Sequence, residues 1–222
     1  MTDGIIFDLD GTFWDTTEVV SRAWNEIREK RPDVTFRATP KRLKQLFGRP
    51  LPVIAEIIFP ELSREKQLRL MDECCKNEHL FLHRTPGTLF PDVEATLKIL
   101  SKAYPLFIVS NCEAGYIEVF LESTGFGKYF TDHECPGNTG KYKAENILLV
   151  KERNHLSSPV YVGDTQGDAD ASQKANVPFI YAAYGFGDVS TYTAKLSAFS
   201  ELPSVLKELN AGEVYAKTQG GN

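Results

Sequence analysis

The chain has 222 residues, of which 42% are hydrophobic and 25% charged, and its formal net charge at pH 7 is −5. This length suits one large domain, or a core domain with an inserted module, and the composition is that of a globular protein with a substantial core. The negative charge argues against nucleic acid as a main partner, and no apolar run approaches the roughly 20 residues that a membrane-spanning helix needs.

The N-terminal residues and the cysteines indicate the expected cellular compartment. The N-terminal residues lack the basic region and apolar stretch of a signal peptide. None of the four cysteines has the spacing of a zinc site, and the adjacent Cys74 and Cys75 cannot readily bridge each other. We therefore expect free thiols in a reducing cytoplasm, and a monomer or homodimer with no membrane or nucleic-acid partner.

An apolar run over residues 5–7 predicts a buried strand that ends in two acids, Asp8 and Asp10, followed by Gly11 and Thr12. Side chains two positions apart on a strand point to the same face, so the two carboxylates project together and repel unless a cation lies between them. Gly11 lets the backbone approach a ligand closely, and Thr12 adds a donor. This stretch therefore predicts a site for a divalent cation and a phosphate. A calcium loop of EF-hand type would need further acids and a closing glutamate.

The segment after these acids has only helical patterns. The predicted helices cover residues 16–30, 42–47, 53–59 and a longer stretch that begins at Ser63. Pro32 ends the first of them, because proline disfavours helical geometry in the residue before it. Strand-like alternation is absent, so residues 16–84 are expected to form an all-helical insertion.

From residue 85 onward, apolar strand runs alternate with amphipathic segments. The predicted strands cover residues 106–109, 160–162 and 179–182, and the predicted helices cover 93–100, 117–124, 144–153, 168–175 and 202–209. Residues 126–132 are expected to be irregular or a short strand, and residues 211–222 a disordered tail. Alternating strands and helices pair in parallel with right-handed crossovers. The expected fold is α/β, with a doubly wound parallel sheet formed by residues 1–15 and 85–210.

Polar residues follow three of the predicted strands. Asp8 and Asp10 follow the first strand, Ser110 and Asn111 follow another, and Asp164 follows the strand over 160–162. Ligands of doubly wound sheets bind outside the carboxyl ends of the strands, so these clusters are expected to converge on one site. Taken alone, Ser110 and Asn111 also suit the cap of the next helix.

Four motifs occur in order along the chain: Asp8-x-Asp10-Gly11-Thr12, then Ser110, then a lysine at 141 or 143, then Gly163-Asp164-x-x-x-Asp168. This series resembles the motifs of the haloacid dehalogenase-like (HAD) hydrolase superfamily. The resemblance implies that Asp8 is a nucleophile that forms an aspartyl-phosphate, and that Asp10 protonates the leaving group and then activates water. It also implies Mg²⁺ held by Asp8, Asp164 and the backbone carbonyl of Asp10. Asp168 would orient a metal-bound water or the lysine.

The lysine motif is matched by two residues, because Lys141 and Lys143 both precede the predicted 144–153 helix. The sequence Lys143-Ala-Glu-Asn-Ile resembles forms found in the family, which favours Lys143, although the common Lys-Pro-x-Pro form is missing. By the same resemblance, phosphate would be bound by Gly11, Thr12, Ser110 and Asn111.

The insertion over residues 16–84 resembles the helical C1 cap of the subfamily that contains phosphoglycolate phosphatase and β-phosphoglucomutase. Arg49 lies where such caps often carry a substrate loop, and it could pair with an anionic substrate or be a surface residue in a turn. Asp10 favours phosphate chemistry, because dehalogenases usually lack it. β-Phosphoglucomutases typically carry a histidine where this chain has Val20. The resemblance thus implies a Mg²⁺-dependent phosphatase for a small phosphorylated metabolite, with a phosphosugar mutase or a non-catalytic binding protein as alternatives.

Overall fold

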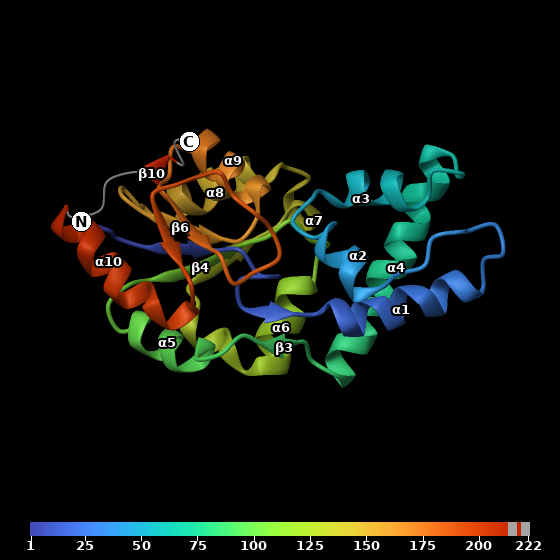
Figure 1. Ribbon diagram of the computed structural model, residues 1–222, viewed down its shortest axis with the longest axis horizontal. Coiled ribbons are helices and arrows are strands. Elements are labelled where there is room, and N and C mark those ends of the chain that lie inside the picture. Colours follow the sequence, from blue (N-terminus) through green and yellow to red (C-terminus); the bar gives the residue numbers. More distant parts are fainter. Residues whose placement is uncertain (213–216, 219–222) are drawn as a thin grey trace.

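The computed structural model describes residues 1–212 and 217–218. Its core is a sheet of six parallel strands between two layers of helices, with a helical unit beside it (Figure 1). The strand order is β5-β4-β1-β6-β7-β9, in which β1 is Ile5–Phe7, β4 Leu106–Val109, β5 Asp132–Glu134, β6 Val160–Gly163, β7 Phe179–Ala182 and β9 Ala194–Leu196. The predicted doubly wound α/β fold is confirmed.

Helices cover both faces of this sheet (Figure 1). One face carries α8 (Lys143–Arg153) and α9 (Gln166–Lys174), and the other carries α5 (Val93–Leu100), α6 (Tyr116–Thr124) and α10 (Leu202–Ala211). Within the described part of the chain, no helix is both long enough and apolar enough to cross a membrane.

Alternation along the strands divides the core into two clusters. Ile5, Phe7 and Ile108 point to the cluster under α5 and α6, whereas Ile6 and Phe107 point to the cluster under α8 and α9. Both faces are buried by helices, so both need apolar side chains. This is the physical reason that the strands form continuous apolar runs.

The insertion is a helical cap. Its helices are α1 (Thr17–Glu29), α2 (Pro40–Lys44), α3 (Leu51–Ile58) and α4 (Arg64–Arg84), with α1 and α3 packed on α4. Two short antiparallel strands, β2 (Trp14–Asp15) and β3 (Thr88–Leu89), join the cap to the core. Apolar side chains of the cap and of one sheet face belong to the same buried cluster.

The sequence patterns miss several short elements. These are the 3₁₀ helices η1 (Phe126–Tyr129) and η2 (Phe199–Glu201), the helix α7 (Pro136–Thr139), the strands β5 and β9, and a small pair formed by β8 (Thr191–Tyr192) and β10 (Lys217–Thr218). The disordered tail predicted over 211–222 is wrong at Ala211, which ends α10, and over Lys217–Thr218, because the backbone there pairs with β8. The remainder of that prediction, over 213–216 and 219–222, lies outside the described residues.

Candidate active site

The carboxyl ends of β1, β4 and β6 meet beneath the cap. Between the ends of β1 and β4 and the cap lies a cavity of about 40 Å³. Of the site residues predicted from the sequence, those that line it are Asp8, Asp10, Arg49, Ser110 and Asn111. Residues far apart in the chain therefore meet at one edge of the sheet, which is where ligands of doubly wound sheets bind.

A lysine links two buried carboxylates at the floor of the site. Lys143 Nζ lies 2.7 Å from Asp8 Oδ1 and 2.6 Å from Asp168 Oδ1, and all three side chains are buried. Burial opposes the ammonium charge, but the carboxylates of Asp168 and Asp8 outweigh it and raise the pKa of Lys143. Burial and the charge of Asp168 raise the pKa of Asp8 to about 6, against the pull of Lys143. Lys141, the other candidate, is exposed.

Asp168 also caps the start of α9. Its Oδ2 accepts hydrogen bonds from the backbone N–H of Thr165 at 3.0 Å and from the Thr165 hydroxyl at 2.6 Å. The Thr165 hydroxyl in turn accepts from the backbone N–H of Asp168, which completes a capping box. The helix cap therefore fixes the carboxylate that holds Lys143.

Three carboxylates lie close enough to hold one cation. Asp8, Asp164 and Asp168 each offer an oxygen within 4.8 Å of the others. Asp164 is fully buried; its Oδ2 accepts from the Phe186 N–H, but its Oδ1 has no hydrogen-bond partner among the described residues. Burial, with the charges of Asp168 and Asp8, raises the pKa of Asp164. Since both Asp168 oxygens already accept bonds, Asp8 and Asp164 remain for a hard divalent ion such as Mg²⁺, and this oxygen-rich set fits it.

The turn after β1 requires a glycine. Gly11 has φ +81°, and a Cβ there would lie 2.1 Å from Asp164 Oδ2. Only glycine allows this close approach of the two motifs. Thr12 is fully buried and is not among the residues that line the cavity, and its hydroxyl has no partner within the described chain.

Asp10 lies beside two hydroxyl groups. Its Oδ1 accepts from Thr16 Oγ1 at 2.7 Å and from the Tyr116 hydroxyl at 2.9 Å. Burial raises the pKa of Asp10 to about 7; the Thr16 bond opposes this, and the nearby charge of Asp8 adds to it. The carboxyl group is thus suited to exchange a proton near neutral pH. The sequence reading missed Tyr116, because no motif marks the residue of α6 that reaches this carboxylate.

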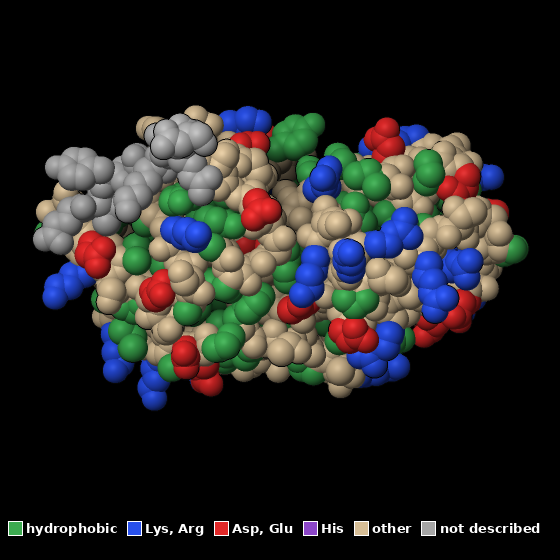
Figure 2. Space-filling model, in the orientation of Figure 1, with side chains coloured by type: hydrophobic (Ala, Val, Ile, Leu, Met, Phe, Trp, Pro, Cys, Tyr) green, Lys and Arg blue, Asp and Glu red, His purple; other side chains and the backbone are tan. Residues whose placement is uncertain are grey.

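The cap closes the cavity from above. Arg49 is exposed at its rim, and the Asn111 side-chain amide donates to the Gly48 carbonyl at 2.8 Å, which joins core to cap. Glu78 and Trp24, which the sequence did not indicate, also line the cavity. A wider cleft of about 900 Å³ opens beside this core–cap contact, where the surface is hollowed between the two parts (Figure 2).

Comparisons with known proteins identify the family of the chain. A phosphoglycolate phosphatase from Yersinia pseudotuberculosis is 27% identical over 199 residues, which cover 82% of each protein. A haloacid dehalogenase-like family hydrolase from Streptococcus pneumoniae has a TM-score of 0.81 at 18% identity, covering 92% of this chain and 98% of that chain. A β-phosphoglucomutase from Clostridium difficile has a TM-score of 0.74 at 18% identity, covering 96% and 99%. The sequence model of haloacid dehalogenase-like hydrolases matches residues 5–182. The chain therefore belongs to the haloacid dehalogenase-like hydrolase family, as its motifs predict.

Proposed function

We propose that the protein is a cytoplasmic, Mg²⁺-dependent phosphatase that hydrolyses a small phosphomonoester through an aspartyl-phosphate on Asp8. The observation that carries this proposal is the buried Asp8 carboxylate, which lies 2.7 Å from Lys143 Nζ and close to Asp164, whose Oδ1 has no hydrogen-bond partner among the described residues. Relatives that carry the name phosphoglycolate phosphatase support phosphoester hydrolysis as the reaction.

In the first step, an oxygen of Asp8 attacks phosphorus; an O–P bond to Asp8 forms while the P–O bond to the leaving group breaks. The Lys143 ammonium, held at 2.6 Å by Asp168, offsets the negative charge of the nucleophile and of the transferring group. Ser110 and Asn111, at the end of β4, supply neutral donors for the phosphoryl oxygens.

Mg²⁺ would be held by Asp8, Asp164 and the backbone carbonyl of Asp10. When bound, it supplies positive charge that stabilises the phosphoryl oxygens as the bonds change. The closed cap excludes bulk water from this low-dielectric site, which strengthens each of these electrostatic interactions.

Asp10 moves the proton in both steps. With a pKa of about 7, it can give its proton to the departing oxygen. Its carboxylate then takes a proton from the water that attacks the phosphorus of the aspartyl-phosphate. The bond between Asp8 and phosphorus breaks, inorganic phosphate leaves, and both carboxyl groups return to their starting states.

Two alternatives have less support. In a mutase of β-phosphoglucomutase type, the position of Val20 would hold a histidine, whereas here it is a fully buried apolar residue of α1. A non-catalytic scaffold would be expected to lose members of the reactive set, yet Asp8, Asp10, Lys143 and Asp164 are all present.

The test replaces the nucleophile. Asp8→Asn is expected to lower the Mg²⁺-dependent hydrolysis of p-nitrophenyl phosphate by about a thousandfold or more, because the amide cannot form the phosphoryl intermediate. The exposed Asp33→Asn is the matched control. Mg²⁺ is also expected to raise the melting temperature of the wild type but not of Asp164→Asn. Equal turnover by wild type and Asp8→Asn would contradict the mechanism, and isomerisation of a sugar 1-phosphate would favour the mutase.

A further inference from the structure

The side of the cavity away from the catalytic lysine has a chemistry of its own. Here the cap contributes Glu78, Trp24 and Arg49, and the core contributes Glu113. The leaving group of a phosphomonoester held over Asp8 would face these side chains. The cavity volume of about 40 Å³ corresponds to roughly three water molecules, and the cavity borders Asp8 and Ser110 as well, so it favours a leaving group of only a few non-hydrogen atoms.

Glu78 is the most unusual of these residues, because it is an acid buried inside the cap. It lies in α4 and is only 8% exposed. Its Oε2 accepts a hydrogen bond from the Trp24 indole N–H, and no other described group donates to it. A carboxylate can accept about four hydrogen bonds, so Glu78 retains unused acceptor capacity beside the cavity. A buried carboxylate with a single neutral partner is costly to ionise, which makes an incoming cationic donor favourable.

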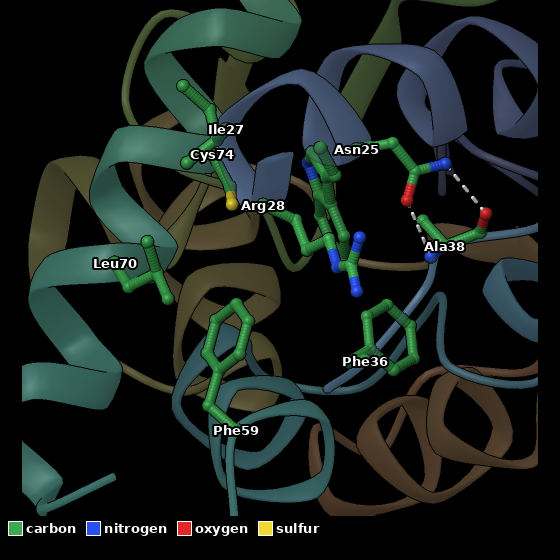
Figure 3. A pocket seen from close by; sticks show the side chains of 9 residues that line it. Asn25, Ile27, Arg28, Phe36, Ala38, Phe59, Leu70 and Cys74 are labelled. Carbon is green, nitrogen blue, oxygen red and sulfur yellow. Dashed lines mark hydrogen bonds between the residues drawn. The ribbon is translucent and has the colours of Figure 1, made fainter. Parts of the chain in front are cut away.

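Trp24, the hydrogen-bond partner of Glu78, is buried inside the cap. Trp24 is 3% exposed and lies in α1, against a pocket in the interior of the cap whose walls include Phe36 and Phe59 (Figure 3). The adjacent Asn25 donates to the Ala38 carbonyl and accepts from the Ala38 N–H, both at 2.9 Å (Figure 3). The hydrogen bonds of Asn25 tie α1 to the segment at Ala38, and the buried indole directs its N–H at the Glu78 carboxylate.

The charges divide into two groups. When ionised, Asp8, Asp164 and Asp168 would carry three negative charges, which Lys143 and one divalent cation would balance, and Asp10 beside them exchanges a proton near neutral pH. Glu78 and Glu113 are then left on the leaving-group side, where the only cationic residue lining the cavity within the described chain is Arg49, exposed at its rim. A cationic leaving group complements these acids, whereas a second anion would have to lie against them.

We infer that the preferred substrate is the phosphate ester of a short amino alcohol, whose ammonium group binds Glu78 at the wall of this cavity. Burial raises the pKa of Glu78 to about 8, although the hydrogen bond from Trp24 lowers it in part. An ammonium group would stabilise the ionised form of Glu78, which burial disfavours. Since this inference rests on the proposed phosphatase activity, its test must separate the two.

Three esters with two-carbon leaving groups form a matched panel: 2-aminoethyl phosphate, 2-hydroxyethyl phosphate and 2-phosphoglycolate. They differ at the terminal group, which is an ammonium, a hydroxyl or a carboxylate. With Mg²⁺, the wild-type kcat/KM is expected to be about tenfold to a hundredfold higher for the ammonium ester than for the hydroxyl ester, and lowest for the carboxylate. Equal values, or a preference for phosphoglycolate, would overturn the inference while supporting a phosphatase. No hydrolysis of any phosphomonoester would overturn the proposed function itself.

Variants test the assignment to Glu78. Glu78→Gln is expected to reduce the preference for ammonium over hydroxyl to about threefold or less, mainly through a higher KM for the ammonium ester. Glu65→Gln, on the same helix but with an 80% exposed side chain, should retain the wild-type ratio. Trp24→Phe keeps the acid but removes its donor, so it should lower the ratio even if Glu78→Gln does not fold. An unchanged ratio in both Glu78→Gln and Trp24→Phe would refute the assignment.

Discussion

Replacement of Glu78 by glutamine should change how the stability of the protein depends on pH. Burial raises the pKa of Glu78 from 4.5 to about 8 in the folded state. The folded protein therefore keeps a proton that the unfolded chain releases, so the free energy of unfolding falls as pH rises between these values. A difference of roughly 3.5 pH units, at about 1.4 kcal/mol per unit, amounts to about 5 kcal/mol. The stabilisation of the folded state by this retained proton is fully present below about pH 4.5 and is lost above about pH 8.

Glutamine cannot ionise, and its amide oxygen can still accept from the Trp24 N–H. In Glu78→Gln the free energy of unfolding should therefore not fall with pH in this way. Relative to the wild type, the variant should become more stable by several kcal/mol between about pH 5 and about pH 9. The measurement is urea unfolding of metal-free protein, followed by tryptophan fluorescence at intervals across that range. Asp10 titrates in both proteins, so most of its effect cancels in the difference, and only its charge interaction with Glu78 is lost in the variant. Parallel stability curves for wild type and Glu78→Gln would refute the reasoning, and Glu65→Gln should run parallel to the wild type.

Two further substitutions test the floor of the site. Lys143→Met should lower phosphatase turnover by about a hundredfold to a thousandfold, and it should destabilise the protein by about 3–5 kcal/mol because it leaves buried carboxylates uncompensated. Replacement of the exposed residue in Lys141→Met should have neither effect. Equal effects of the two substitutions in kinetic and unfolding assays would contradict the assignment of Lys143. Gly11→Ala should abolish turnover and lower the melting temperature more than Gly125→Ala. Both glycines have positive φ, but a Cβ at Gly125 meets nothing within 4 Å, so similar melting temperatures would show that the contact of Gly11 with Asp164 is unimportant.

The sequence was sufficient for the sheet core and for bringing the motif residues to one edge of the sheet, because both rest on local patterns. Apolar runs marked four of the six strands, including β4 over Leu106–Val109, and parallel pairing brought the residues after them to one edge. The edge strand β9 was missed, since Ala194–Leu196 is only three residues long and its pattern is too short to distinguish from a loop. The pairing of Lys217–Thr218 with β8 likewise has no local signal.

The upper wall of the cavity could not be predicted, because it depends on tertiary packing. Glu78 follows an amphipathic pattern within α4, and nothing in that pattern distinguishes an acid that faces Trp24 from one that faces solvent. Tyr116 and Thr16 converge on Asp10 only once α6 lies beside the start of the cap. Resemblance favoured Lys143 over Lys141, but the contact of Lys143 with Asp8 and the exposure of Lys141 are visible only in the structure.

The position of β1 in the sheet has a consequence for synthesis and quality control. It is the first strand of the sheet to be made, yet it is central, and its neighbours begin to pair only when Leu106 and Val160 become available. Closing such long loops is entropically costly and tends to slow folding. The strand that precedes Asp8 must wait while the whole cap emerges from the ribosome. A chain cut short before Val160 would lack one of the two strands that flank β1, so the acids could not assemble. A nascent chain therefore becomes catalytically competent only late in synthesis, and enzyme activity indicates that β4 and β6 have paired with β1.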